Sequence, residues 1–131
     1  NWGGSRIVGV TKDLGQTWEK HPPNRTAQLK EPVCQGSLLA VDGVPGAGRV
    51  VLFSNPNTTS GRSHMTLKAS TNDAGSWPED KWLLYDARKG WGYSCLAPVD
   101  KNHVGVLYES QWALNFLKIP YKDVLNAKTA R

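Results

Sequence analysis

An eight-residue motif occurs twice in this chain and constrains its fold more than any other feature. The first copy is Thr11-Lys-Asp-Leu-Gly-Gln-Thr-Trp18, and the second runs from Ser70 to Trp77. Asp13 can accept backbone N–H bonds inside a tight turn, and Gly15 can adopt a positive φ angle. The tryptophan that ends the motif can anchor a β-hairpin with its apolar ring. Two hairpin turns of one kind predict a repeated sheet unit, which is typical of propellers and other repeat architectures.

Short apolar or alternating runs between turn signals predict an all-β fold. We expect three groups of two, four and three strands, the middle group being a complete antiparallel meander the size of one propeller blade. The expected strands lie, in order, at 6–11, 17–20, 37–41, 50–53, 64–69, 82–85, 94–97, 104–108 and 113–117. Pro120 and a helix-like segment at 121–126 follow the last strand.

Strand order predicts which residues share an edge of these sheets. In a meander, the start of the first strand, the end of the second and the start of the third lie at the same edge. Tyr93 begins a first strand, and Glu109 ends a second one. Arg62 begins a third strand, and Gln35 precedes a first one. We therefore expect these residues on one edge and both turn motifs on the opposite edge.

The residues of this edge admit two interpretations. Arg62 and Glu109 can form an exposed ion pair of little energetic value, with Tyr93 as a half-buried strand aromatic. Alternatively, Arg62 can grip a carboxylate with two parallel hydrogen bonds, and Tyr93 can act as a nucleophile when a neighbouring base takes its proton. The polar loop 55–62 and the glycines that flank Trp91 favour the functional interpretation.

Composition limits the partners and cofactors of the chain. A net charge of +5 over 131 residues favours anionic partners, but no basic run is longer than Arg88-Lys89, so nucleic acid is not expected. No stretch approaches the roughly 18 apolar residues of a membrane span. Cys34 and Cys95 are expected to be two buried thiols, with a disulfide as the alternative. Their spacing from the histidines predicts no metal site, and no cofactor is expected.

Several motifs in the chain resemble those of a known enzyme family. The turn motifs are similar to the Asp boxes of sialidases, which are glycoside hydrolases built on a six-bladed β-propeller. The strings PVCQGSLL, VVLFSNPN, KGWGYSCL and GVLYES resemble, in this order, the last half of the sialidase catalytic domain, especially in secreted enzymes of gut bacteria. The resemblance covers the chain from about Ser5 to Leu117. The second motif departs from the family pattern, with Asn72 for the aspartate and Ala74 for the glycine.

The resemblance implies an architecture for the whole chain. It implies the C-terminal portion, about two and a half blades, of a six-bladed β-propeller with antiparallel four-stranded blades. Residues 1–33 would hold the end of a blade and a loop, residues 34–90 a complete blade, and residues 91–131 a last blade without its closing strand. The abrupt start inside a loop is also what a fragment would show. The expected partner is the N-terminal part of the same sialidase domain.

The resemblance also implies roles for single residues. Arg62 matches the third member of the arginine triad that holds the sialic acid carboxylate. Tyr93 matches the catalytic nucleophile, and a tyrosine nucleophile sets sialidases apart from most glycosidases. Glu109 matches the carboxylate that orients the first triad arginine. Gln35 and Trp91 would line the pocket.

The expected function is part of a retaining exo-α-sialidase that removes terminal sialic acid from sialylated glycans, in a secreted or periplasmic bacterial enzyme. The first and second triad arginines, the acid/base aspartate and the glutamate that activates the tyrosine would all lie in earlier blades, so the chain alone is expected to be inactive. One alternative is a propeller lectin or pseudoenzyme that binds sialic acid through Arg62 without cleaving it. A propeller with a structural or protein-binding role is a third, because a fold alone does not fix a function.

Overall fold

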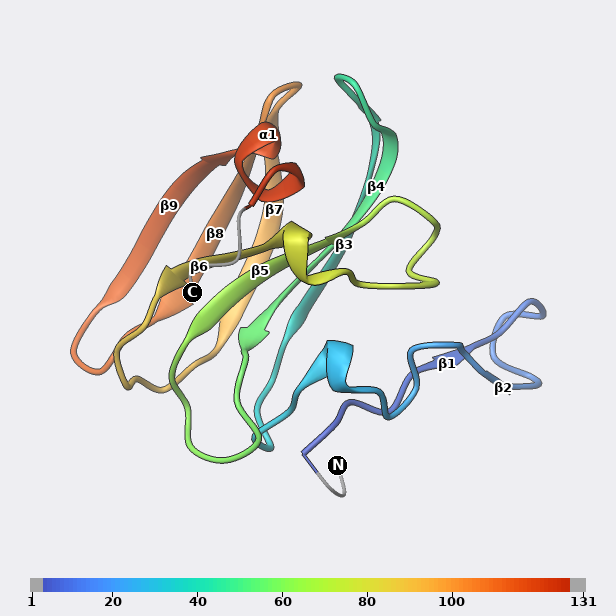
Figure 1. Cartoon of the computed structure of the whole chain (residues 1–131), viewed down its shortest axis with the longest axis horizontal. Coiled ribbons are helices and arrows are strands. Elements are labelled where there is room, and N and C mark those ends of the chain that lie inside the picture. The colour runs from blue at the N-terminus through green and yellow to red at the C-terminus, as the bar shows by residue number, and fades with distance from the viewer. Residues whose placement is uncertain (1–3, 128–131) are drawn as a thin grey trace.

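The computed structural model of the chain, which describes residues 4–127, contains three separate antiparallel sheets (Figure 1). The first sheet contains β1 (Gly9–Val10) and β2 (Glu19–Lys20). The second contains β3 (Ser37–Val44), β4 (Gly48–Pro56), β5 (Met65–Ser70) and β6 (Trp82–Asp86). The third contains β7 (Ser94–Asp100), β8 (His103–Glu109) and β9 (Leu114–Pro120). The expected all-β fold, with strands grouped as two, four and three, is confirmed.

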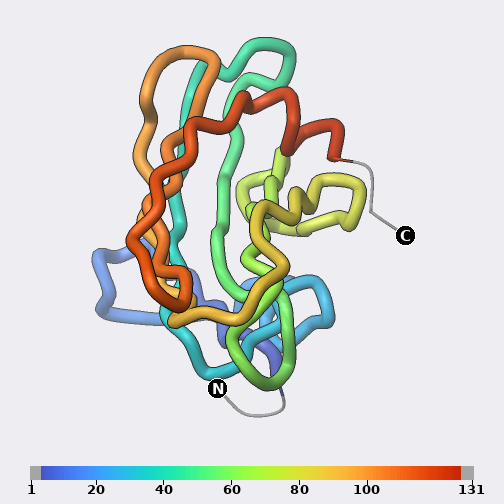
Figure 2. Tube along the Cα trace, turned by 90° about the vertical axis from the view of Figure 1, so that its left-hand side faces the viewer, coloured from blue at the N-terminus to red at the C-terminus, as the bar shows by residue number. Residues whose placement is uncertain are grey.

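Three short helical segments complete the described part of the fold. Two are 3₁₀ turns, at Ala27–Leu29 and Glu79–Lys81, and the third is α1 (Tyr121–Leu125). Pro120 precedes α1, where the missing N–H of proline costs no helical hydrogen bond. In Figures 1 and 2, α1 lies at one end of the molecule, where it packs against β5, β6 and β9. No helix among residues 4–127 is long and apolar enough to cross a membrane.

The main core lies between the second and third sheets. It is formed by the inward side chains of β3, β4, β5, β7, β8 and β9 together with α1. Leu52 and Leu67 from one sheet and Val106 from the other are completely buried, and each such side chain stabilises the fold by about 1.5–3 kcal/mol. Figure 2 shows the two sheets side by side, with β3 and β7 as their neighbouring strands.

The strand β4 is buried on both faces. Its second face packs in a smaller cluster with Leu29 and Trp77, in which the rings of Phe53 and Trp77 meet edge to face at 6.0 Å. The strand therefore reads as a continuous apolar run rather than an alternating one, as expected for a strand covered on both sides.

Both turn motifs form the same hydrogen-bonded turn between antiparallel strands. In the first, the Asp13 carboxylate accepts bonds from the Thr11 hydroxyl at 2.7 Å and the Thr17 N–H at 2.9 Å. In the second, the Asn72 side-chain oxygen accepts the corresponding bonds at 2.8 and 3.0 Å. The amide also reverses one contact, because Asn72 donates to the Ser76 hydroxyl, whereas Asp13 accepts from the hydroxyl of Thr17.

The two motif tryptophans differ in burial. Trp77 is 2% exposed beneath β4, whereas Trp18 is 66% exposed and its indole N–H donates to the Gly15 carbonyl at 3.1 Å. The expected anchoring by a buried ring thus holds for the second turn. In the first turn the ring covers Gly9 instead of entering the core.

The expectation of two buried thiols is wrong for one cysteine. Cys34 is buried, but Cys95 is exposed, and both are free of a disulfide. Cys95 lies on β7 between Ser94 and Leu96, whose side chains point into the core. Because side chains alternate along a strand, Cys95 must face outward.

Candidate functional site

The loops that carry the predicted site residues are joined by backbone hydrogen bonds at one edge of the sheets (the lower edge in Figure 1). The N–H of Gly90 donates to the Arg62 carbonyl at 3.0 Å. The N–H of Gly92 donates to the Glu109 carbonyl at 3.2 Å, and the Glu109 N–H donates to the Tyr93 carbonyl at 2.9 Å. Arg62, Tyr93 and Glu109 therefore share an edge, as strand order predicted. The second turn motif lies at the other end of β5.

The guanidinium group of Arg62 is held by two backbone carbonyls. Its Nη1 donates to the Trp91 carbonyl at 2.9 Å, and its Nη2 donates to the Val33 carbonyl at 3.2 Å. A guanidinium carries five N–H donors, so three of them are left for other acceptors. Arg62 is partly exposed, and its side chain therefore presents an oriented positive fork at the surface.

The ring of Tyr93 lies next to this guanidinium, 5.2 Å from ring centre to Cζ of Arg62. Tyr93 is 46% exposed, so solvent reaches this residue. A positive charge over an aromatic face is attracted by the ring quadrupole. The contact therefore fixes a cation and a phenol side by side.

A shallow hollow of about 250 Å³ brings three of the predicted residues together. Gln35, Tyr93 and Glu109 line it, with β7, β8 and β9 supplying the remaining walls. Arg62 borders this hollow only through the Tyr93 ring, and Trp91 is absent from its lining. The structure thus gathers three of the five residues in one hollow and places the other two beside it.

Gln35 connects two sheets rather than pointing free into solvent. Its side-chain amide exchanges hydrogen bonds with both backbone groups of Ser94, accepting from the N–H at 3.0 Å and donating to the carbonyl at 3.1 Å. Ser94 directly follows Tyr93, and Gln35 precedes β3. The pair therefore ties the start of β7, directly after Tyr93, to the loop before β3 in the second sheet.

Trp91 contacts the site mainly through its backbone carbonyl. Its carbonyl accepts a hydrogen bond from Arg62, its indole N–H donates to the Gln111 carbonyl at 3.1 Å, and the residue is 61% exposed. The indole ring therefore lies against the 110–113 loop, to which this hydrogen bond holds it. A pocket-lining role for this ring stays a prediction.

Two residues that sequence reasoning missed, Glu31 and Arg6, lie directly behind Arg62, next to Cys34. Glu31 is buried and pairs with Arg6, and both contact the backbone of Cys34. The thiol of Cys34 donates to the Gly92 carbonyl at 3.3 Å, and burial raises the pKa of this thiol. No local pattern could have paired Arg6 with Glu31, because the two are distant in the sequence. A charged residue in the proline-flanked loop before a buried cysteine was the one available signal.

Gly92 occupies a position that fits no larger residue. Its φ angle is +81°, and an added Cβ would lie 2.9 Å from Pro56 Cγ and 3.2 Å from Cys34 Sγ. We expect Gly92→Ala to lower the free energy of unfolding by about 1–3 kcal/mol through overpacking and backbone strain. Urea unfolding measures this change.

A matched variant separates the two contributions. Gly61 has a similar φ of +69° in the loop that carries Arg62, but an added Cβ there meets no atom within 4 Å. Gly61→Ala should therefore show the backbone strain alone, about 1 kcal/mol. Equal losses in the two variants would contradict the close packing around Gly92.

The second and third sheets are antiparallel meanders that pack with their first strands, β3 and β7, adjacent, as successive blades of a β-propeller do. No protein-family model matches the chain. It is 46% identical to a sialidase of Bacteroides fragilis over 95% of its own length, and 30% identical to a sialidase of Clostridium perfringens over 96%. It is also 30% identical to an anhydrosialidase of Macrobdella decora over 94% of its length. The solved Hadza microbial sialidase Hz136 superposes on 93% of the chain with a TM-score of 0.85 at 46% identity.

In sequence and fold the chain therefore belongs with the sialidases. It spans a limited part of these relatives, namely 23% of the Bacteroides enzyme, 35% of the Clostridium enzyme and 24% of the solved chain. The match thus corresponds to a portion of the propeller.

Proposed function

We propose that this chain supplies part of the active site of a retaining exo-α-sialidase, with Arg62 as a substrate-binding residue and Tyr93 as the nucleophile. The observation that carries the proposal is the contact of the Arg62 guanidinium with the Tyr93 ring at an exposed edge. The similarity to sialidases across nearly the whole chain supports the same assignment.

The chemistry of sialic acid fits these two side chains. Its anomeric carbon carries a carboxylate, which the free N–H groups of Arg62 can bind as a fork. The same negative charge would repel an aspartate or glutamate nucleophile, whereas a neutral phenol avoids this repulsion. Attack by the Tyr93 oxygen forms a bond to the anomeric carbon as the bond to the leaving oxygen breaks, and water later releases the sugar with retained configuration.

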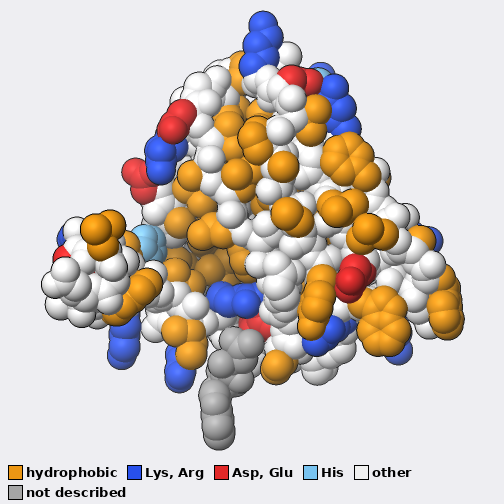
Figure 3. Space-filling model, turned by 180° about the vertical axis from the view of Figure 1, so that it is seen from behind, with side chains coloured by type: hydrophobic (Ala, Val, Ile, Leu, Met, Phe, Trp, Pro, Cys, Tyr) orange, Lys and Arg blue, Asp and Glu red, His pale blue; other side chains and the backbone are white. Residues whose placement is uncertain are grey.

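This mechanism needs groups that we assign to the rest of the domain. A base must take the phenolic proton and an acid must protonate the leaving oxygen. We therefore propose that the chain works only when it is assembled with the remaining blades, and we call that assembly the reconstituted domain. Outward-facing apolar side chains on the third sheet, among them Leu107, Leu114 and Phe116, offer a surface for such a partner, and apolar side chains spread over the face in Figure 3.

The proposal is tested by release of sialic acid from a sialylated glycan by the reconstituted domain. We expect Arg62→Lys to raise KM for the sialoside by about 10–100-fold, because a point charge replaces the fork at a cost of a few kcal/mol. The exposed Arg25→Lys variant, on the loop after β2, should leave KM unchanged.

The outcomes separate the candidate functions. Binding of sialic acid without release by the wild-type assembly would favour a lectin instead of an enzyme. If the wild-type assembly neither bound nor released sialic acid, both the enzyme and the lectin assignments would be wrong.

A further inference from the structure

An ion pair with a buried carboxylate lies directly behind the site edge. Glu31 is 1% exposed, and its carboxylate contacts the guanidinium of Arg6. Arg6 also lies over the ring of Phe53, 5.3 Å from its centre. Removing the Glu31 carboxylate from water is costly, and replacing a buried ion pair by apolar residues is often neutral for stability. The pair therefore calls for an explanation other than stability.

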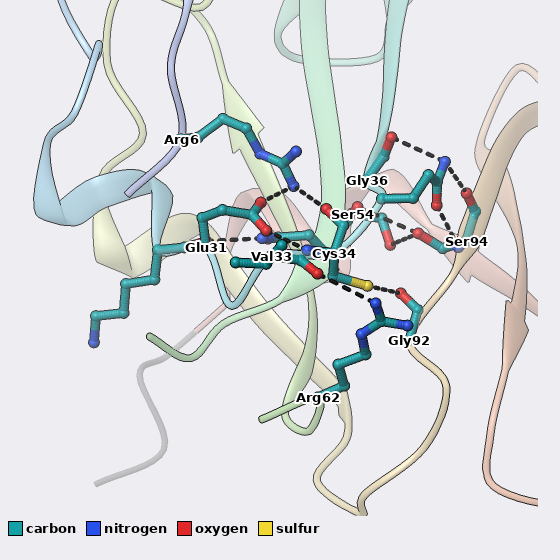
Figure 4. Close-up of polar contacts among 12 residues, drawn as sticks. Arg6, Glu31, Val33, Cys34, Gly36, Ser54, Arg62, Gly92 and Ser94 are labelled. Atoms are coloured by element: carbon teal, nitrogen blue, oxygen red, sulfur yellow. Dashed lines mark hydrogen bonds and ion pairs between the residues drawn. The ribbon is translucent and has the colours of Figure 1, made fainter. Parts of the chain in front are cut away.

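Both charged groups grip the backbone of one residue. The Glu31 carboxylate accepts the N–H of Cys34, and Arg6 Nη2 donates to the Cys34 carbonyl at 3.0 Å. Hydrogen bonds with one charged partner are about twice as strong as neutral ones. Figure 4 shows these groups converging on Cys34, with Arg62 on the other side.

The first of these bonds also sets the direction of the Val33 carbonyl. The Val33 carbonyl and the Cys34 N–H belong to one planar trans peptide group and point in opposite directions. While Glu31 holds the N–H on the inner side, the carbonyl faces outward, where it accepts Nη2 of Arg62 at 3.2 Å. The orientation of one peptide plane therefore links Glu31 to Arg62.

The conformation of this peptide group must be stabilised by surrounding residues. Val33 has a φ angle of +62°, a region that β-branched residues rarely adopt. Strained backbone persists only where the surroundings fix it. Without Glu31, the 33–34 peptide can rotate to relieve the strain and withdraw its carbonyl from Arg62.

We propose that Glu31, paired with Arg6, is a positioning residue for Arg62, because Glu31 holds one arm of its fork through the 33–34 peptide. The inference rests on the proposed function, since it concerns how the substrate-binding arginine is aimed. The second arm is held independently by the Trp91 carbonyl at 2.9 Å. Loss of the pair should therefore misalign Arg62 without releasing it.

The test replaces both charges together in the reconstituted domain, as Arg6→Met with Glu31→Leu. An apolar pair avoids leaving one buried charge unpaired, so the variant is expected to fold with a Tm close to that of wild type. We expect KM for a sialoside to rise about tenfold and kcat to change less. The milder Arg6→Lys variant, which keeps the charge and loses the contact with the Cys34 carbonyl, should give a smaller rise. If the double variant fails to fold, KM of the Arg6→Lys variant is compared with that of wild type instead. A rise in KM supports the positioning role, and an unchanged KM contradicts it.

A cycle with Arg62→Ala identifies the route of the effect. If the pair acts through Arg62, replacing it in the Arg62→Ala background changes KM no further, whereas a general structural role gives additive losses. Asp42→Asn provides the control, because it breaks an exposed ion pair with Arg49 at the opposite edge and should leave KM unchanged.

A crystal structure of the double variant gives a readout that does not need activity. We expect the Arg62 to Val33 contact to be lost and the Trp91 contact to be kept. An unchanged Arg62 together with an unchanged KM would overturn the positioning role. If the wild-type assembly neither binds nor releases sialic acid, the proposed function fails, and the crystal structure still decides the role of the pair.

Discussion

Tyr93→Phe is expected to lower sialic acid release by the reconstituted domain about 10²–10⁴-fold, an effect on kcat, with a small change in KM. The variant removes only the phenolic oxygen that would attack the anomeric carbon. The ring remains, so its contact with the Arg62 guanidinium and its place at the start of β7 are kept. Residual turnover is expected because binding and electrostatic stabilisation by the other groups persist.

The control for this prediction is Tyr121→Phe. Tyr121 is buried in α1, and its hydroxyl has no hydrogen-bond partner within the described part of the chain, so removing it should leave turnover unchanged. Single-turnover measurements with a good leaving group separate attack by the nucleophile from release of the product. Normal turnover by Tyr93→Phe would exclude this residue as the nucleophile and leave Arg62 as a binding residue.

We expect the free energy of unfolding to increase as pH rises from about 7 to about 10.5, because the buried amine of Lys68 loses its proton in the folded state. The side chain is completely buried on β5, where its Nζ donates to the Gln28 carbonyl at 2.9 Å and lies 4.5 Å from the centre of the Trp82 ring. Burial, together with the charges of Lys30 and Arg6, lowers the pKa of this amine from 10.5 to about 7, against the opposing effect of Glu31 and Glu79.

The sign of the effect follows from proton counting. Between pH 7 and 10.5 the unfolded chain keeps the lysine proton, whereas the folded chain has released it, so rising pH favours the folded state. Each pKa unit corresponds to about 1.4 kcal/mol, which gives a total on the order of 3–5 kcal/mol across the window. Below pH 7 both states are protonated, and the cost of the buried charge is constant.

Urea unfolding at fixed protein concentration over this pH range measures the change. Lys68→Met, which keeps the length of the side chain, should remove this rise and stabilise the protein near neutral pH. Lys12→Met is the control, because the Lys12 side chain is exposed and its loss should leave the pH dependence intact. Parallel curves for wild type and Lys68→Met would show that the buried amine does not titrate in this window.

The strands and the edge that carries the site were predictable because both follow from patterns of neighbouring residues in the sequence. Alternation and turn residues fix where strands begin and end, and the antiparallel register then brings Glu109 opposite Tyr93 without further information. The position of Cys95 was predictable by the same alternation. The general tendency of cysteine to be buried led to the wrong expectation there.

Contacts between sheets could not be predicted in the same way. The Arg6–Glu31 pair and the Gln35–Ser94 bonds join residues whose separation in sequence carries no periodic signal. The burial of Lys68 could not be predicted either, since lysine is almost never fully buried. Such contacts depend on how the sheets stack, which strand patterns do not specify.

The two turn motifs show what this kind of turn requires of a sequence. The Asn72 oxygen accepts the same bonds as a carboxylate oxygen of Asp13, so the turn needs an acceptor at that position and no negative charge. Ala74 adopts a φ of +61° where the first copy has Gly15, so glycine is not obligatory either. A search pattern that demands aspartate and glycine would overlook the second copy. A pattern of hydroxyl, side-chain oxygen, hydroxyl and tryptophan would find both.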